Sequence, residues 1–214
     1  ALYWRDFFTL VLSFNPYVLG SAYNKAYNNL TWENDEAKFK RWCDGQTGFP
    51  LVDAGMRELN KTGFMHNRVR MVAASFLVKC LHIDWRWGEK YFAQRLVDYD
   101  PAVNNGNWQW VASTGCDAQP YFRIFNPWIQ QKKFDPEAAY IKKWVSELSS
   151  ASVASIHALD KRGIAGYQAP MIDYKKESKQ TLKAYKDAKG KMRLFRPECN
   201  IQRLLNSSRR ISLP

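Results

Sequence analysis

Apolar residues recur at helical spacing along most of this chain, and no segment alternates apolar and polar residues as a half-buried strand does. Proline and capping residues mark where the expected helices begin. Pro50 follows a glycine break, and Asp135-Pro136-Glu137 is a helix start that we expect to open a helix ending at Leu148. The pattern predicts an all-α fold. Further helices are expected at 2–14, 35–44, 50–60, 66–83, 88–98 and 174–189, with loops near 99–107 and 113–121.

The tryptophans divide the chain unequally, because all nine lie before residue 150. We interpret residues 1–148 as a helical core and 149–189 as a linker and helix of the same domain. Residues 190–214 form a basic tail that we expect to be poorly ordered. The first helical segment follows Ala1 directly, without an initiator Met, so we expect the chain to be part of a longer protein, with the upstream half of the domain outside it.

The net charge of +12 would attract nucleic acid, but most of the excess falls in residues 151–214. A basic run of this kind is more often solvated surface than a binding site. Charge alone therefore leaves DNA binding open.

Several classes of function find little support in the sequence. The longest apolar stretches, near 7–14 and 71–78, fall far short of the roughly 20 residues that a membrane helix needs, so we expect no membrane association. The four cysteines form no CxxC pair, so we expect no metal site. Ser-His-Asp, HExxH, GxxxxGK and GxGxxG patterns are all missing.

Polar side chains share one face of the helix expected at 66–83. The stripe consists of Asn67, Arg70, Met71 and Ala74, which fall at i, i+3, i+4 and i+7. This stripe is polar for a core, and a half-exposed helix with a buried ion pair is the competing interpretation. Asp98 is a natural partner for Arg70, since a buried charge must be paired.

A second polar group follows this helix along the chain. Asp98-Tyr99-Asp100 supplies two carboxylates, and residues 104–110 read Asn-Asn-Gly-Asn-Trp-Gln-Trp. We expect this group to form a turn. Its density of tryptophans and amides suits the recognition of a planar cofactor or a base better than hydrolysis.

Consecutive strings along the chain form a set of motifs. They are Trp4-Arg5-Asp6-Phe7-Phe8, Gly48-Phe49-Pro50-Leu51-Val52-Asp53-Ala54, residues 62–71, Ala74-Ser75-Phe76-Leu77, Ile83-Asp84-Trp85-Arg86 and residues 104–126. In order and spacing they resemble the photolyase/cryptochrome family, most of all class I cyclobutane pyrimidine dimer photolyases. The resemblance is dense over 2–148 and weak over 149–189. It implies the C-terminal portion of that family's all-α FAD-binding helical domain.

The resemblance implies non-covalently bound FAD and a role for four residues around it. The family residue that matches Asn104 faces flavin N5. Those that match Asp98 and Arg70 form an ion pair against the isoalloxazine, and the match of Asp100 hydrogen-bonds its polar edge.

The resemblance also implies a DNA partner that contains pyrimidine dimers. In the family, residues matching Trp4 and Trp110 wall the cavity that receives the flipped-out lesion, and those matching Asn67 and Met71 contribute contacts. The positions that match Arg68 and Arg123 approach DNA phosphates. Aromatic walls of this kind suit extruded bases, which stack on them.

Three tryptophans match the family's electron-hopping triad, namely Trp108, Trp85 and Trp32. The implied activity is light-driven repair, in which excited reduced FAD donates an electron that splits the cyclobutane ring. Two alternatives stay open. One is a cryptochrome-type photoreceptor without repair activity, and the other is a truncated, non-enzymatic fragment that binds nucleic acid without flavin.

Within the family, the sequence favours repair of cyclobutane dimers. Asn67 and Met71 stand where enzymes for (6-4) lesions resemble one another in having His, and Asn104 stands where plant cryptochromes typically carry Asp. The resemblance further implies a monomer, an antenna domain in the full-length protein, and a place in the cytoplasm or nucleoid, or in the nucleus if the source is eukaryotic.

Overall fold

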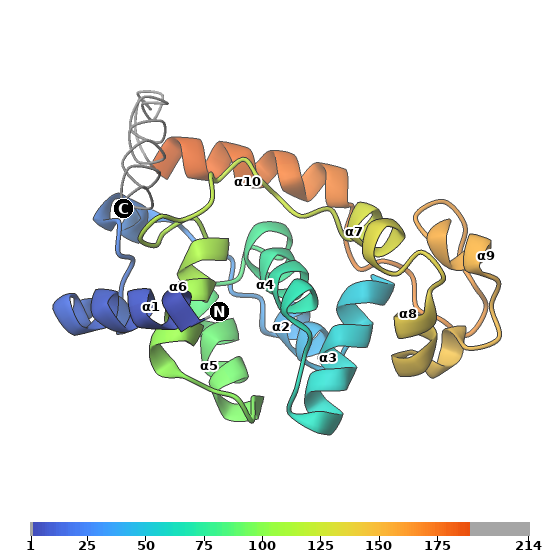
Figure 1. Cartoon of the computed structure of the whole chain (residues 1–214). Helices are drawn as coiled ribbons and strands as arrows, with labels where there is room; N and C mark the ends of the chain where they lie inside the picture. The colour runs from blue at the N-terminus through green and yellow to red at the C-terminus, as the bar shows by residue number, and fades with distance from the viewer. Residues whose placement is uncertain (1, 189–214) are drawn as a thin grey trace, which may run out of the picture.

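The computed structural model describes residues 2–188, and these form helices without a strand (Figure 1). The tail predicted to be poorly ordered, residues 190–214, lies outside the described residues. The helices in chain order are α1 (Leu2–Phe14), η1 (Pro16–Leu19), η2 (Lys25–Asn29), α2 (Glu36–Cys43), α3 (Pro50–Thr62), α4 (Asn67–Cys80), α5 (Trp85–Arg95), α6 (Pro101–Val111), α7 (Pro127–Phe134), α8 (Ala139–Trp144), η3 (Ser146–Leu148), α9 (Val153–His157) and α10 (Tyr174–Ala188).

Side-chain caps fix where several helices begin. The carboxylates of Asp35, Asp84 and Asp100 each accept a hydrogen bond from a backbone N–H in the first turn of the helix that follows. Pro101 stands in the first turn of α6, where its missing N–H costs no hydrogen bond. Gly63 ends α3 at φ 71°, a left-handed conformation that glycine adopts without strain.

The core lies around α3 and α4, whose side chains are buried along most of their length. Trp42, Phe49 and Phe76 are among the largest side chains that are fully buried there. Helix α3 packs against α4 and α8, and α10 runs along the top of the view in Figure 1, where it lies against α4 and η2. This packing leaves the beginning of α4, with its predicted polar stripe, free to face α6.

Helices α1, α5 and α6 pack together beside this core (Figure 1). The approach of α1 to α6 depends on a glycine, because a Cβ on Gly106 would lie 2.1 Å from Cδ1 of Phe8. On the other side of α6, Trp108 presses against Gly88 of α5, where a Cβ would lie 2.1 Å from the indole. Two glycines therefore let α6 sit between its neighbours.

The structure corrects several boundaries. The loop predicted at 99–107 is wrong, because α6 covers Pro101–Val111: the Asp100 cap and Pro101 offset the low helix propensity of the Asn-Gly run. The helix predicted over 135–148 is interrupted, since Asp135 ends α7 and its carboxylate accepts the N–H groups of Tyr140 and Ile141. The helix predicted at 88–98 begins three residues earlier, at Trp85, and the first part of 149–189, which we interpreted as a linker, contains α9.

Within residues 2–188 no helix has both the length and the apolar character needed to cross a membrane. The same described residues hold no group of three or more His, Cys, Asp and Glu side chains arranged to bind a metal ion.

Candidate functional site

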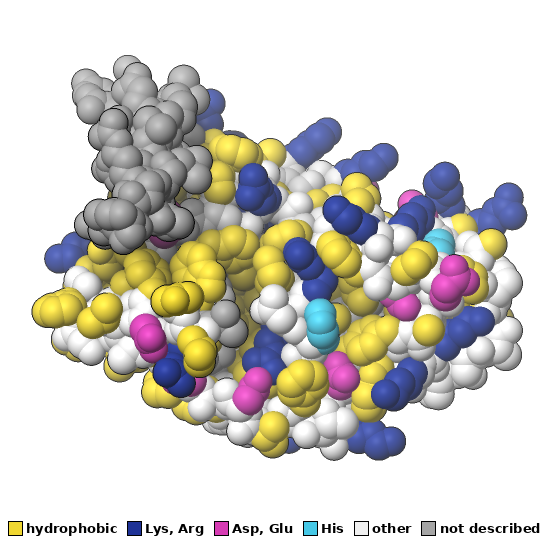
Figure 2. All heavy atoms as spheres, in the orientation of Figure 1, with side chains coloured by type: hydrophobic (Ala, Val, Ile, Leu, Met, Phe, Trp, Pro, Cys, Tyr) yellow, Lys and Arg dark blue, Asp and Glu magenta, His cyan; other side chains and the backbone are white. Residues whose placement is uncertain are grey.

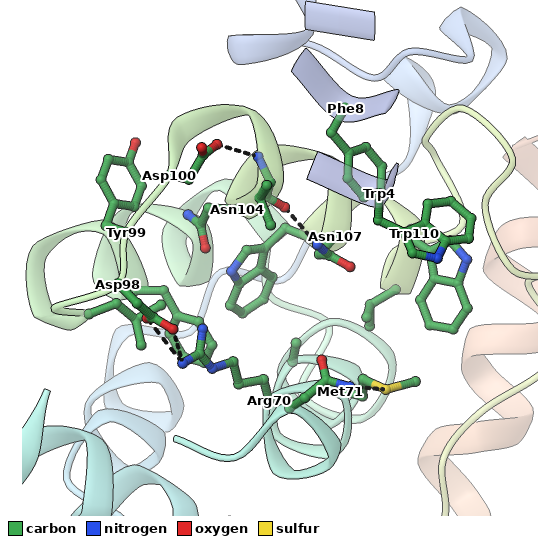
Figure 3. A pocket seen from close by; sticks show the side chains of 17 residues that line it. Trp4, Phe8, Arg70, Met71, Asp98, Tyr99, Asp100, Asn104, Asn107 and Trp110 are labelled. Carbon is green, nitrogen blue, oxygen red and sulfur yellow. Dashed lines mark hydrogen bonds and ion pairs between the residues drawn. The ribbon is translucent and has the colours of Figure 1, made fainter. Parts of the chain in front are cut away.

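A cavity of about 510 Å³ opens between α1, the first turns of α4, the end of α5 and α6 (Figure 3). This is within the usual size range of small-molecule sites. Nine of the residues predicted from the sequence line it: Trp4, Asn67, Arg70, Met71, Asp98, Asp100, Asn104, Trp108 and Trp110. These residues are spread over more than a hundred positions of the chain, so the fold gathers them.

The predicted pair of Arg70 and Asp98 is formed at the edge of this cavity. Nη2 of Arg70 lies 2.9 Å from Oδ2 and 3.1 Å from Oδ1 of Asp98, and Nε of Arg70 donates to the carbonyl of Met65 at 2.6 Å. The side chains are 25% and 48% exposed, so the ion pair is solvated and not buried as the sequence argument assumed. The second contact nevertheless fixes the guanidinium on α4, facing the turn after α5 (Figure 3).

Helix α6 supplies the polar wall. Asp100 is its N-cap, and Oδ1 accepts from the N–H of Val103 at 2.9 Å. One turn later the buried Asn104 donates from Nδ2 to Oε1 and to the backbone carbonyl of Glu89, at 2.9 and 3.1 Å. Asn107 donates back to the carbonyl of Val103 at 2.8 Å. The capped helix therefore presents a carboxylate and two amides to one cavity (Figure 3).

Aromatic rings form the apolar walls. Trp4 stacks on Phe8 with ring centroids 5.9 Å apart, and Trp4 is 52% exposed at the cavity mouth. Trp110 is half-buried, whereas Trp108 is only 2% exposed and lies deep in the core. Figure 3 shows Trp4 and Trp110 on the side of the cavity opposite Asp98 and Tyr99. The cavity thus has a charged end and an indole-lined end.

The start of α4 completes the rim. Nδ2 of Asn67 lies 3.9 Å from Sδ of Met71, one helical turn further on, and both side chains line the cavity. Both side chains are accessible from solvent. They are placed where an incoming ligand would meet them before it reached Trp108.

Four predicted residues lie outside the cavity. Trp85 is buried at the start of α5, one helical turn before the Gly88 that Trp108 touches. Trp32 is half-buried in the segment before α2 and packs against the core. The Arg68 guanidinium lies over the ring of Phe134 at 4.5 Å, and Arg123 is exposed in the loop before α7. The structure therefore places both arginines outside the cavity and both tryptophans in contact with the hydrophobic core.

Two residues of the site were not predicted from the sequence: Glu89, which is bonded to Asn104, and Phe8, whose ring lines the cavity. Burial raises the pKa of Glu89, and the hydrogen bond from Asn104 opposes that rise. Nothing in the sequence marked Glu89, because an acid in the middle of a surface-like helix is common. Phe8 was detectable, since it falls four residues after Trp4 on the same helical face.

The surface around the site carries scattered charge. Figure 2 shows Lys and Arg side chains spread along the edge formed by α10 and over the α7–α9 end of this face, without one dense basic patch. Exposed apolar side chains gather instead on α1, namely Leu2, Tyr3, Leu10 and Phe14. The N-terminal helix thus carries a group of exposed apolar side chains.

The donor set indicates what the cavity suits. Indole and phenyl faces accept a flat ring, while the guanidinium, amides and carboxylates along α4 and α6 offer both donors and acceptors to its polar edge. Arg70 brings a positive charge to balance an anionic ring. The residues present therefore fit a planar heteroaromatic group with one polar edge.

Comparison with known proteins points the same way. The chain matches a family described as the FAD binding domain of DNA photolyase over residues 1–187. It is 53% identical over 193 residues to the deoxyribodipyrimidine photo-lyase of Vibrio cholerae, a match that covers 88% of this chain and 41% of that protein. The chain thus spans about two fifths of the length of such curated relatives.

Solved structures agree. An archaeal photolyase from Sulfolobus tokodaii, crystallised with two FAD molecules, superposes with a TM-score of 0.84 at 54% identity, covering 87% of this chain and 43% of that one. A bacterial class III photolyase from Agrobacterium tumefaciens superposes with a TM-score of 0.82 at 45% identity. That match covers 87% of this chain and 41% of the other. These similarities include more than one class of the family.

Proposed function

We propose that this chain, which belongs to the family of FAD-binding domains of DNA photolyases, binds FAD in the cavity between α1, α4 and α6 and serves light-driven repair of pyrimidine dimers in DNA. Since its curated relatives are more than twice as long, the activity belongs to the complete protein. An antenna domain and the upstream half of the helical domain are part of this proposal.

The observation that carries the proposal is that Arg70, Asp98 and Asn104 meet Trp4 and Trp110 in one cavity. Bound FAD would supply the one-electron donation, driven by light, that opens the cyclobutane ring. The protein's own part is to orient the cofactor and to exclude water from the cavity. Arg70, held by Asp98 and the Met65 carbonyl, would balance charge on the flavin ring, and the carboxylate and amides of α6 would hold its polar edge.

The indole-lined end would receive the flipped lesion. Stacking on aromatic side chains contributes about 1–3 kcal/mol per base, which suits Trp4 and Trp110 as its walls, with Asn67 and Met71 beside them. Arg68 and Arg123 on the surface would contact DNA phosphates, which makes affinity fall with salt. Trp108, which lines the cavity, would relay electrons together with Trp85 and Trp32, which lie outside it, and so restore the reduced flavin.

The lesion and the subclass are finer parts of the proposal. Asn67 and Met71 occupy the rim where a histidine pair would be needed to protonate a (6-4) lesion, so we favour cyclobutane dimers. The class I type is favoured on the sequence motifs, and the protein would act as a monomer in the compartment that holds DNA.

Reconstitution with FAD followed by a light-dependent repair assay tests the proposal. The full-length protein should turn yellow, retain flavin after gel filtration and restore dimer-containing DNA only in light. Trp4→Ala and Trp110→Ala should lose repair and keep flavin, whereas Trp144→Phe on α8, outside the cavity, should keep both. Unchanged repair in the first two variants would remove those walls from the site.

Two other outcomes identify the alternatives. Flavin binding with light-dependent tryptophan oxidation but no repair would favour a photoreceptor of the cryptochrome type. A colourless chain that binds DNA with a steep salt dependence would favour a nucleic-acid-binding fragment without flavin.

A further inference from the structure

The segment that carries Trp32 is hydrogen-bonded to the turn that leads into Trp85. The N–H of Glu33 donates to the carbonyl of His82 at 2.8 Å. Oδ1 of Asn34 accepts from the N–H of Asp84 at 2.9 Å. We call these two hydrogen-bonded segments, residues 33–34 and 82–84, the junction. Trp32 directly precedes the first segment, and Trp85 directly follows the second.

Both sides of this junction contain a residue in the left-handed conformation. Asn34 has φ 49° and His82 has φ 54°. Asn and His both occur in this region more often than most other non-glycine residues. Such conformations persist where surrounding contacts determine them. Each of these two left-handed residues accepts one of the two hydrogen bonds of the junction.

Helix α10 contacts the junction through two of its side chains. Nε2 of His82 lies 2.7 Å from Oε2 of Glu177, and the two side chains are only 8% and 13% exposed. One turn further along α10, Gln180 donates to Oε1 of Glu33 at 2.9 Å. Lys38 of α2 reaches the other oxygen of the same carboxylate at 3.0 Å. The junction is therefore tied to a third element that neither tryptophan belongs to.

Trp85 is held by the same turn. Asp84 is the N-cap of α5, its Oδ1 accepts from the N–H of Arg86 at 3.0 Å, and its carboxylate pairs with the Arg86 guanidinium. Because the cap fixes the first turn of α5, it fixes the direction in which Trp85 leaves the backbone. A shift of residues 82–84 would move Trp32 and Trp85 relative to each other.

We propose that this junction is the device that sets the gap between Trp32 and Trp85, with Asn34 and His82 as its positioning residues and Glu177 of α10 as the group that holds it closed. The inference rests on the proposed function for the use of that gap. In the relay, Trp32 gives one electron to oxidised Trp85, which returns to its neutral form, and Trp32 becomes the oxidised residue. The hop slows as the rings separate, so the junction controls its rate.

A measurement without flavin tests the positioning itself. The full chain is labelled with 5-fluorotryptophan, and the fluorine resonances of Trp32, Trp85 and Trp144 are assigned by Trp→Phe replacements. In Asn34→Ala and in Glu177→Ala, the Trp32 and Trp85 resonances should shift and broaden while that of Trp144 stays. Asn34→Asp and Glu177→Gln keep an acceptor oxygen and should restore the original spectrum.

The second arm measures the hop in FAD-loaded protein by flash photolysis. Asn34→Ala should slow the formation of the Trp32 radical several-fold and leave oxidation of Trp108 unchanged, and Asn34→Asp should recover the rate. Unmoved Trp32 and Trp85 resonances in Asn34→Ala and Glu177→Ala would overturn the inference. If Asn34→Ala does not fold, Glu177→Ala decides, because it leaves the backbone junction intact. A failure of wild-type protein to bind FAD would count against the proposed function alone, since the fluorine spectra do not depend on flavin.

Discussion

The side-chain amide of Asn104 on α6 is bonded to the carboxylate of Glu89 on α5, with Nδ2 2.9 Å from Oε1. The same nitrogen lies 3.1 Å from the Glu89 carbonyl, so one amide connects both backbone and side chain of the neighbouring helix. Asn104 is buried and lines the cavity, and burial raises the pKa of Glu89. This contact makes the deep wall of the site sensitive to charge.

Asn104→Asp should make stability depend on pH. Two carboxylates in hydrogen-bonding distance cannot both ionise cheaply, so the folded-state pKa of one rises above its unfolded value. Stability from that group is present at low pH and is lost as pH rises through the raised pKa. Urea unfolding should find the variant close to wild type near pH 4 and weaker by about 2 kcal/mol at pH 8. Asn107→Asp, exposed on the same helix, should show no such difference; equal pH profiles for the two variants would contradict the coupling.

Asp98→Asn should weaken flavin binding more than it weakens the fold. The ion pair with Arg70 is solvated, and such pairs contribute less than about 1 kcal/mol to stability. The substitution removes the negative charge and one acceptor oxygen facing Arg70, so the guanidinium is held less firmly, although the Met65 carbonyl and the Phe64 ring still contact it. FAD titration by fluorescence should give a several-fold higher Kd with a nearly unchanged Tm. Asp44→Asn removes a comparable surface pair with Lys40 and is the control; if both variants bind FAD like wild type, the ion pair has no part in the site.

Gly88→Ala should destabilise the fold although alanine is the better helix former. A Cβ there would lie 2.1 Å from Cη2 of Trp108 and 2.6 Å from Cδ2 of Leu77, both in the core. Overpacking of this kind costs about 1–3 kcal/mol, which exceeds the roughly 1 kcal/mol gained in helix propensity. Gly163→Ala meets nothing within 4 Å and should be neutral in the same urea titration. Equal stability of the two variants would mean that Trp108 can shift freely.

Helices with a clear apolar stripe were predictable from sequence. The first helix is found as predicted, at Leu2–Phe14, and the last begins at Tyr174 as expected. Helix α6 was not predicted, because its Asn-Gly run has low intrinsic helix propensity. Its stability comes from packing between Phe8 and α5. Helix α7 was also missed, although Asn126-Pro127 is the same kind of start signal as Asp135-Pro136.

The site, like the fold, was predictable from the sequence only in part. Nine of the residues identified through motifs line one cavity, since many motif positions mark side chains that face a ligand. What the sequence lacked was the support behind them. Glu89 under Asn104, and the backbone carbonyl of Met65 under Arg70, are contacts between distant segments that no local pattern encodes.

Lys79 on α4 should make the stability of the fold depend on pH. Its side chain is fully buried, and Nζ donates only to neutral oxygens, Oγ of Ser113 at 2.9 Å and the carbonyl of Arg123 at 3.2 Å. Burial lowers the pKa of Lys79 from 10.5 to about 7. Between these values the unfolded chain binds more protons than the folded chain, so the contribution of Lys79 to stability is complete above 10.5 and is lost as pH falls towards 7 and below.

Lys79→Met, which keeps the length of the side chain and removes its charge, should therefore change the shape of the pH profile. The loss of the two hydrogen bonds is the same at every pH, but the charge penalty of wild type is present only at low pH. The stability of Lys79→Met relative to wild type should fall as pH rises from 7 to 10, by up to about 1.4 kcal/mol per pH unit. Lys183→Met, on the exposed side of α10, should run parallel to wild type over the same range. If the pH profile of stability of Lys79→Met also ran parallel to that of wild type, the buried ammonium would have an ordinary pKa.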